Sequence, residues 1–117
     1  MVATLDFRRL RYYTERFEEV GAVSKPTDIQ RRTVHYRGMV QGVGFRYTAR
    51  RIALRFPVAG YVQNLADGRV LLMVEGERGQ LDGYLAAVSQ SLGDYIVEAE
   101  VQVGPPEGKI RGFDIRF

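Results

Sequence analysis

The chain has 117 residues, no cysteine, a net charge of +3 and a sequence pI of about 9.4. One domain of this size can bury a core, and the absence of cysteine excludes disulfides and thiol catalysis. No apolar run reaches the length of a membrane span, and the amino terminus lacks the apolar core of a signal peptide, which predicts a soluble, cytoplasmic protein without contact with a membrane.

Positive charge is unevenly distributed along the chain. Residues 1–32 carry seven basic and five acidic side chains, whereas residues 33–117 carry ten and nine. A basic pI raises the question of nucleic-acid binding. The near neutrality of the second part argues against a long polyanion and favours a small anion as its ligand. The acidic residues interspersed in the first part argue against nucleic acid and membranes there as well.

Residues 1–32 have the pattern of an amino-terminal extension with a linker at 25–28. Apolar residues recur in it at helical spacing, namely Leu10, Tyr13, Phe17 and Val20. Gly21 then ends the pattern. Two interpretations stay open. The extension is either a helix of about four turns that packs on the domain or on a second copy, giving self-association, or a frayed tail or misassigned start.

Residues 33–117 predict the order strand, helix, strand, strand, helix, strand and a short last strand. Apolar residues alternate in the strands and recur every three to four residues in the helices. The expected strands span 33–40, 58–64, 69–75, 95–103 and 112–117. This order predicts an α+β protein with the ferredoxin-like β-α-β-β-α-β arrangement, in which a mainly antiparallel sheet is covered by two helices on one face.

Both expected helices have an apolar stripe. The first, over 46–56, should end at Phe56-Pro57, because the residue before a proline is pushed out of helical geometry. Its stripe consists of Ala49, Ile52, Ala53 and Phe56. The second follows Gly79 and ends at Gly93, and its stripe consists of Leu81, Tyr84, Leu85, Val88 and Leu92.

The stretch from Gly38 to Arg46 joins the first strand to the first helix. Gly42 and Gly44 permit backbone angles that other residues avoid, so successive N–H groups can turn toward one point. A helix that begins at about Arg46 directs its unpaired N–H groups and the positive end of its dipole at the same point. The stretch therefore predicts an anion site of phosphate size, with the guanidinium of Arg46 at its rim.

Arg46 is unfavourably placed unless an anion binds near it. A cation in the first turn opposes the helix dipole by about 0.3–1 kcal/mol. The same helix also carries Arg50, Arg51 and Arg55 and no acidic residue. Arg51 and Arg55 lie opposite the apolar stripe, where they can be solvated, whereas Arg46 and Arg50 flank the loop. The pattern therefore indicates phosphate chemistry at Arg46.

Two long motifs resemble the signatures of the acylphosphatase family. The signature G-x-V-Q-G-V-G-F-R appears as Gly38–Arg46, and G-x-V-x-N-x-x-D-G-x-V appears as Gly60–Val70. Glu75-Gly76 and 113–116 are also similar to the family, so the resemblance covers about 33–117 and leaves 1–32 outside. It departs at Phe56-Pro57 and at Tyr61, where a leucine-glycine pair and a tryptophan are more usual. These departures put local packing in doubt.

The resemblance implies an enzyme that hydrolyses acyl phosphates to a carboxylate and inorganic phosphate. It implies that Arg46 grips the phosphate and that Asn64 positions the attacking water. It also implies a cradle of backbone amides from Gln41, Gly42, Val43, Gly44, Phe45 and Arg46. Neither a metal nor another cofactor is implied, and inorganic phosphate or sulfate would bind as a product-like ligand.

Two non-catalytic functions use the same fold order. One is a module that binds acyl or carbamoyl phosphates within a larger assembly, which would have to form between chains. The other is an RNA-binding module, which stacks bases on aromatic residues of its third strand. The expected third strand, 69–75, contains no aromatic residue, which argues against RNA.

Three single residues have plain structural interpretations. His35 lies on a strand, and the implied mechanism does not require it. Asp67 has the position of a turn residue whose carboxylate bonds nearby backbone. Asn64 alone would also be interpreted as a turn former, and only the resemblance assigns it to the site.

Overall fold

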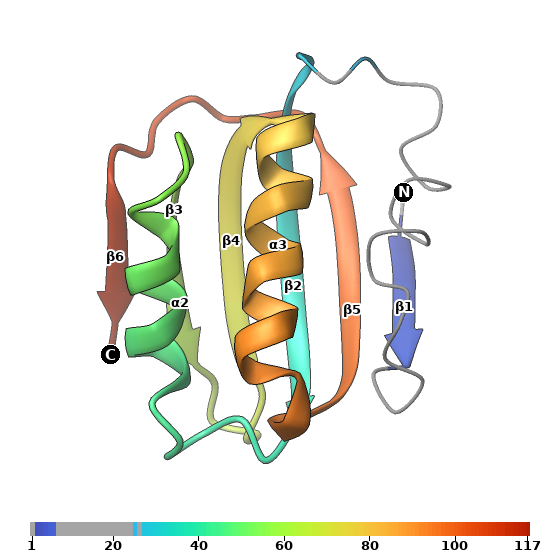
Figure 1. Ribbon diagram of the computed structural model, residues 1–117, viewed down its shortest axis with the longest axis vertical. Helices are drawn as coiled ribbons and strands as arrows, with labels where there is room; N and C mark the ends of the chain where they lie inside the picture. Colours follow the sequence, from blue (N-terminus) through green and yellow to red (C-terminus); the bar gives the residue numbers. More distant parts are fainter. Residues whose placement is uncertain (1, 7–24, 26) are drawn as a thin grey trace.

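The computed structural model describes residues 2–6, 25 and 27–117. The elements in this part of the chain are β1 (Val2–Asp6), β2 (Ile29–Gly38), α2 (Phe45–Ala53), β3 (Ala59–Asn64), β4 (Val70–Glu77), α3 (Arg78–Leu92), the 3-10 helix η2 (Gly93–Tyr95), β5 (Ile96–Gly104) and β6 (Phe113–Arg116). The strands form one sheet in the order β1-β5-β2-β4-β3-β6, and α2 and α3 both cover the same face (Figure 1).

The ferredoxin-like arrangement predicted from the sequence is confirmed. In the centre of the sheet, β5, β2, β4 and β3 pair antiparallel, while β6 joins β3 in parallel. At the opposite edge, β1 pairs antiparallel with β5, from Val2 opposite Gln102 to Asp6 opposite Glu98. The sequence did not predict this edge strand. The predicted helical stripe from Leu10 to Val20 lies outside the described residues.

Two boundaries differ from the prediction by more than two residues. β2 begins at Ile29 instead of Thr33, because its ladder with β4 continues to Glu77. Residues 29–32, which were assigned to the extension, therefore belong to a central strand. α2 ends at Ala53, so the predicted helix end at Phe56-Pro57 is wrong. The amides of Arg55 and Phe56 bond carbonyls three residues back, at 3.0 and 3.1 Å, which tightens the chain out of the α-helix before the proline.

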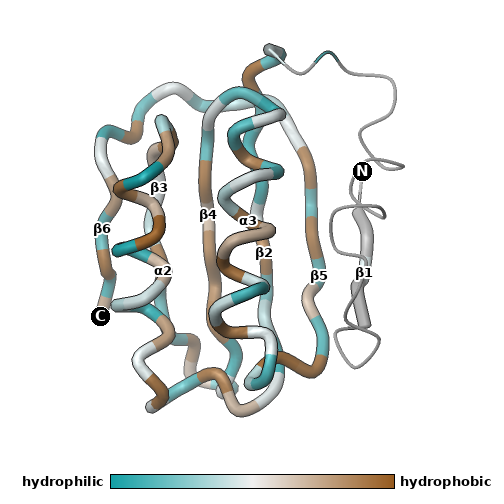
Figure 2. The backbone as a smooth tube through the Cα atoms, in the orientation of Figure 1, coloured by the Kyte–Doolittle hydropathy of each residue, from teal (hydrophilic) through white to brown (hydrophobic). Residues whose placement is uncertain are grey.

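The core lies between the sheet and the two helices. The predicted stripe of α3 is buried in full, and in α2 the buried residues are Phe45, Ala49, Ile52 and Ala53. Along β2, the side chains of Val34 and Tyr36 are fully buried on the helix-covered face. Hydrophobic and hydrophilic residues alternate along β5 (Figure 2). This alternation follows from the strand period of two, because one face of β5 is covered.

Two buried charged side chains, one on β2 and one on β4, link their strands to other elements of the fold. The guanidinium of Arg32, fully buried on β2, pairs with the carboxylate of Asp82 on α3. The carboxylate of Glu75 on β4 accepts hydrogen bonds from the amides of Glu107, at 2.7 Å, and Gly108, at 3.1 Å. The two hydrogen bonds to Glu75 hold the connection between β5 and β6 in place. Nowhere in the described chain is there a helix both long and apolar enough to cross a membrane.

Candidate active site

The loop between β2 and α2 has the backbone that its glycines predicted. Gly42 and Gly44 have left-handed φ values of 79° and 75°, and Gly44 directly precedes α2. A Cβ atom added at either position would meet no atom within 4 Å. Glycine is therefore required by the backbone angle itself and not by crowding.

The amides of this loop are available to a ligand. In the part of the chain that the structure describes, no hydrogen bond uses the N–H groups of residues 41–46, and the first helical bond runs from the amide of Thr48 to Gly44, at 3.0 Å. The first turn of α2 also contains no acidic residue. Unpaired amides at a helix start attract anions, because the helix dipole adds to their partial charges.

Gln41 holds the loop against the neighbouring hairpin. Its side-chain Nε2 donates to the carbonyl of Leu65, at 2.8 Å, and to that of Arg69, at 2.9 Å. Leu65 follows Asn64, and its amide closes the same turn by bonding Arg69, at 2.8 Å. Gln41 therefore links the loop to the strand end that carries Asn64. The sequence predicted a role only for the backbone of Gln41.

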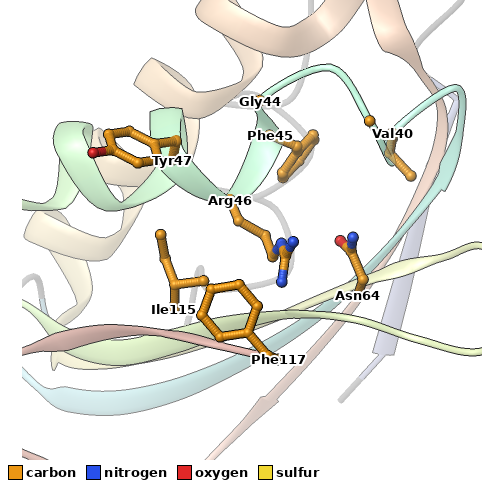
Figure 3. A pocket seen from close by; sticks show the side chains of 9 residues that line it. Val40, Gly44, Phe45, Arg46, Tyr47, Asn64, Ile115 and Phe117 are labelled. Carbon is orange, nitrogen blue, oxygen red and sulfur yellow. The ribbon is translucent and has the colours of Figure 1, made fainter.

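Arg46 and Asn64 face each other across a cavity of about 200 Å³ (Figure 3). The cavity is lined by Val40, Gly42, Gly44, Phe45, Arg46, Tyr47, Asn64, Ile115 and Phe117. The side-chain Oδ1 of Asn64 is buried and has no hydrogen-bond partner within the described residues. A buried acceptor without a partner is unfavourable by about 1–3 kcal/mol, so a ligand or a water is expected at this atom.

The guanidinium of Arg46 is held from the side of β6. Its Nη1 donates to the carbonyl of Arg116, at 3.1 Å, and its central carbon lies 4.7 Å from the centroid of the Phe117 ring. No described carboxylate forms an ion pair with Arg46. No described carboxylate therefore neutralises the guanidinium, and most of its N–H donors are available to an anion.

The predicted site residues divide into two groups. Gly42, Gly44, Phe45, Arg46 and Asn64 all line the cavity. The side chains of the other two do not, since Gln41 bonds the hairpin and Val43 packs against the core. Arg50, predicted to flank the loop, instead donates from Nε to the carbonyl of Phe113, at 3.2 Å.

Sequence reasoning missed the contribution of β6. Ile115 and Phe117 line the cavity because β6 runs parallel to β3, with Ile115 opposite Val62 and Arg116 opposite Gln63. This register brings the end of β6 beside Asn64. The signal was the short apolar pattern of 112–117, but its place in the sheet depends on a parallel pairing that the pattern does not specify.

The remaining candidates behave as structural residues. Asp67 accepts bonds from the amide of Arg69, at 3.1 Å, and from its Nε, at 2.8 Å, which confirms the predicted turn role. The backbone bond from Arg69 is the main reason that the pKa of Asp67 is lowered from its ordinary value. His35 lies on β2 between Leu71 and Glu100, outside the cavity. Burial raises the pKa of Tyr36, whose ring packs 5.0 Å from that of Phe45.

Comparisons with known proteins agree on one family. A family model described as acylphosphatase matches residues 32–115. An acylphosphatase of Archaeoglobus fulgidus is 40% identical over 83 residues, which cover 71% of this chain and 79% of the relative. An acylphosphatase of Thermotoga maritima is 40% identical over 85 residues, which cover 72% of this chain and 93% of the relative.

Solved structures give the same result. The acylphosphatase from Bacillus subtilis superposes with a TM-score of 0.66 at 29% identity, over 77% of this chain and 100% of that chain. HypF of T. kodakarensis superposes with a TM-score of 0.66 at 30% identity, over 75% of this chain but only 12% of that chain. From the match over most of its length, the chain belongs to the acylphosphatase family, hydrolases that act on acid anhydrides.

Proposed function

We propose that this chain hydrolyses acyl phosphates to a carboxylate and inorganic phosphate in the cavity between Arg46 and Asn64. One observation carries the proposal: the unengaged amides of Gly42, Gly44, Phe45 and Arg46 and the guanidinium of Arg46 lie at the same cavity as the unpartnered Oδ1 of Asn64. The first group suits a phosphate, and the second suits a water. Inorganic phosphate or sulfate would occupy the first site as product-like ligands.

The donors at the loop match the charge of a phosphoryl group. Amides fixed by Gly42 and Gly44 need no rearrangement when negative charge spreads over the phosphoryl oxygens. Arg46 adds a planar fork that can bond two of those oxygens at once. Because an acyl phosphate is a mixed anhydride with a carboxylate leaving group, no strong general acid is required, and positioning with charge stabilisation is sufficient.

Asn64 positions the water that acts as the nucleophile. Its Oδ1 accepts a hydrogen bond from a water, and the water oxygen then attacks phosphorus from the side opposite the carboxylate. The bond from phosphorus to the acyl oxygen breaks, and its electron pair leaves with the carboxylate. One proton of the attacking water passes to an oxygen of the substrate's own phosphate, and the other stays on the oxygen that is now bonded to phosphorus. Every atom is thus accounted for without a base from the protein.

Hydrolysis of benzoyl phosphate in the presence of EDTA tests the proposal. We expect turnover that is insensitive to EDTA and that inorganic phosphate inhibits competitively, because product and substrate share the amide cradle. Absence of turnover by the folded protein would overturn the proposal. Turnover that phosphate does not inhibit would place the reaction outside this cavity.

A non-catalytic module remains the alternative. It is supported by the match to HypF, of which the corresponding region is a small part. Such a module would bind acyl or carbamoyl phosphate without turnover, so calorimetry with phosphate beside the hydrolysis assay separates the two. For RNA binding, β4 offers no aromatic residue, and salt-sensitive RNA binding without turnover would be needed to support it.

Two further expectations belong to the same proposal, namely a cytoplasmic location and self-association through residues 1–32. Sedimentation of the full chain and of a variant that begins at residue 27 tests the second. A start at residue 33 would be unsuitable, because it would remove part of β2 and the buried Arg32. The same number of chains per particle for the two proteins would contradict self-association through residues 1–32.

A further inference from the structure

The cavity has a polar end and an apolar end. Arg46, Asn64 and the glycines form the first. On the other side, Figure 3 shows the side chains of Ile115 and Phe117 next to Arg46. Residues two apart in an extended chain point to the same face of a sheet, so the end of β6 presents both apolar groups to the cavity.

The two aromatic side chains near this end are largely exposed to solvent. The side chain of Phe117 is 96% exposed and that of Tyr47 is 73% exposed, although both line the cavity. Burying such a ring is favourable, and apolar surface that stays exposed at the mouth of a pocket indicates a ligand. A hydrocarbon group attached to a phosphate at Arg46 would reach the ring of Phe117, which lies beside the guanidinium.

Within the described part of the chain, the apolar end offers no charged side chain to pair with a second anionic group on that ligand. Among the described residues that line the cavity, Arg46 is the sole one with a charged side chain. The neighbouring arginines are engaged elsewhere: Arg69 bonds Asp67, at 2.8 Å, and the guanidinium of Arg116 lies 3.7 Å from the centroid of the Tyr61 ring. A carboxylate or second phosphate on the acyl group would therefore gain no ion pair at this end, while a hydrocarbon group would gain apolar contact.

We infer that the acyl group of the substrate is an uncharged hydrocarbon chain or ring that packs against Ile115 and Phe117. This inference rests on the proposed function and narrows it to one class of acyl phosphate. In this arrangement Phe117 determines specificity, since it contacts the part of the substrate that varies and not the reacting phosphorus.

A homologous series measures this preference. The full chain is assayed with acetyl, propionyl and butyryl phosphate, and kcat/KM is corrected for the uncatalysed rate of each. We expect an increase of about twofold to fourfold for each added methylene, the upper value corresponding to the roughly 0.8 kcal/mol of a fully buried CH₂ group. A second pair, 4-methylbenzoyl and 4-carboxybenzoyl phosphate, tests charge, and the methyl compound should have at least about a twofold higher kcat/KM, because its methyl group gains apolar contact and the carboxylate does not.

Variants connect the preference to Phe117. In Phe117→Ala, the ratio of kcat/KM for butyryl over acetyl phosphate should fall toward one. Leu54→Ala is the matched control, since Leu54 is 71% exposed and does not line the cavity. Its ratio should equal that of the unchanged chain. Using ratios within one protein removes any effect of Phe117 on Arg46.

Several outcomes overturn the inference. A flat or falling series, a carboxybenzoyl compound that reacts as fast as its methyl analogue, or a ratio unchanged in Phe117→Ala would each do so while leaving acyl phosphate hydrolysis intact. Failure to hydrolyse any member of the series would overturn both the inference and the proposed function.

Discussion

The polar end of the cavity is assembled from two short segments of the sequence, the loop 41–46 and the strand end at Asn64, whereas Ile115 and Phe117 at its apolar end come from the end of the last strand. Residues 41–46 form one loop and one helix start, and Gln41 ties them to the turn after Asn64. Ile115 and Phe117 reach the cavity only through the parallel pairing of β6 with β3. The two segments of the polar end can each be written as a short motif, whereas the apolar end depends on the order and register of the whole sheet. Substitutions at the polar end should therefore affect every acyl phosphate alike.

Arg46→Ala should have the largest effect. Removing one preorganised donor from a charged transition state lowers turnover by about 10²–10³-fold, and Arg46 contributes a full charge as well. We expect at least this loss of kcat/KM with every acyl phosphate. Arg46→Lys should recover only part of it, because an ammonium cannot bond two oxygens as a planar fork. Steady-state kinetics on the purified variants measure both, and full activity of the lysine variant would contradict the fork geometry.

Asn64→Ala should lower kcat by about 10–10²-fold, as expected for a misplaced nucleophile. The inhibition constant of inorganic phosphate should stay nearly unchanged, since the amides and Arg46 remain. The two readouts together separate positioning of water from binding of phosphate. A variant with unchanged kcat would show that another group positions the water.

Gln41→Ala should lower kcat by about tenfold through Asn64, because loss of its two bonds allows the loop and the hairpin to shift. If Gln41 acts through Asn64, the double variant Gln41→Ala/Asn64→Ala should be no slower than Asn64→Ala alone. If the two residues acted independently, the rate losses of the single variants would multiply in the double variant. Gln102→Ala, on an exposed position of β5, is the control. Multiplicative effects would assign Gln41 a role separate from Asn64.

Gly44→Ala should destabilise the fold by about 1–2 kcal/mol, the penalty of a left-handed conformation for a residue with a Cβ atom. Gly104 is a matched position, because a Cβ there also meets no atom within 4 Å but the backbone is not left-handed. Gly104→Ala should be neutral or stabilise by up to about 1 kcal/mol. Denaturant unfolding compares the two, and equal stabilities would contradict the strain at Gly44.

Asp67→Asn should have the smallest effect. The pKa of Asp67 is lowered in the folded protein, so its carboxylate stabilises the fold above the ordinary pKa and loses this contribution as the pH falls through the folded value. At pH 7 the variant should melt slightly lower than the unchanged chain, and the difference should vanish in strong acid. Thermal melting from pH 7 downward tests the sign, and a difference that grows toward acid would contradict it.

Much of the fold was predictable because local patterns agreed with the tertiary structure. The stripe of α3 and the glycines at 42 and 44 specify their elements without help from distant residues. The beginning of β2 was hidden, since Arg31 and Arg32 interrupt the apolar alternation. Arg32 is nevertheless buried, because Asp82 on α3 neutralises it. A partner fifty positions away in the sequence cannot be inferred from the strand alone.

The site was predictable to a similar extent. The proposed phosphate donors follow from backbone angles that glycine permits, so Gly42, Gly44 and Arg46 could be named from the sequence. The side-chain bonds of Gln41 could not be, because they depend on how closely the loop approaches the hairpin. For the same reason the apolar wall of β6 required the register of the sheet. Both omissions concern contacts between separate elements.

The pairing of β1 with β5 has a consequence for aggregation, because it covers an edge of the sheet. While Val2–Asp6 is in place, the outer side of β5 is paired over residues 98–102. Proteolytic clipping between this strand and residue 27 would strip it off and leave an open row of N–H and C=O groups. Such a row is a template for strand addition by another molecule, so the clipped protein should be the form that aggregates.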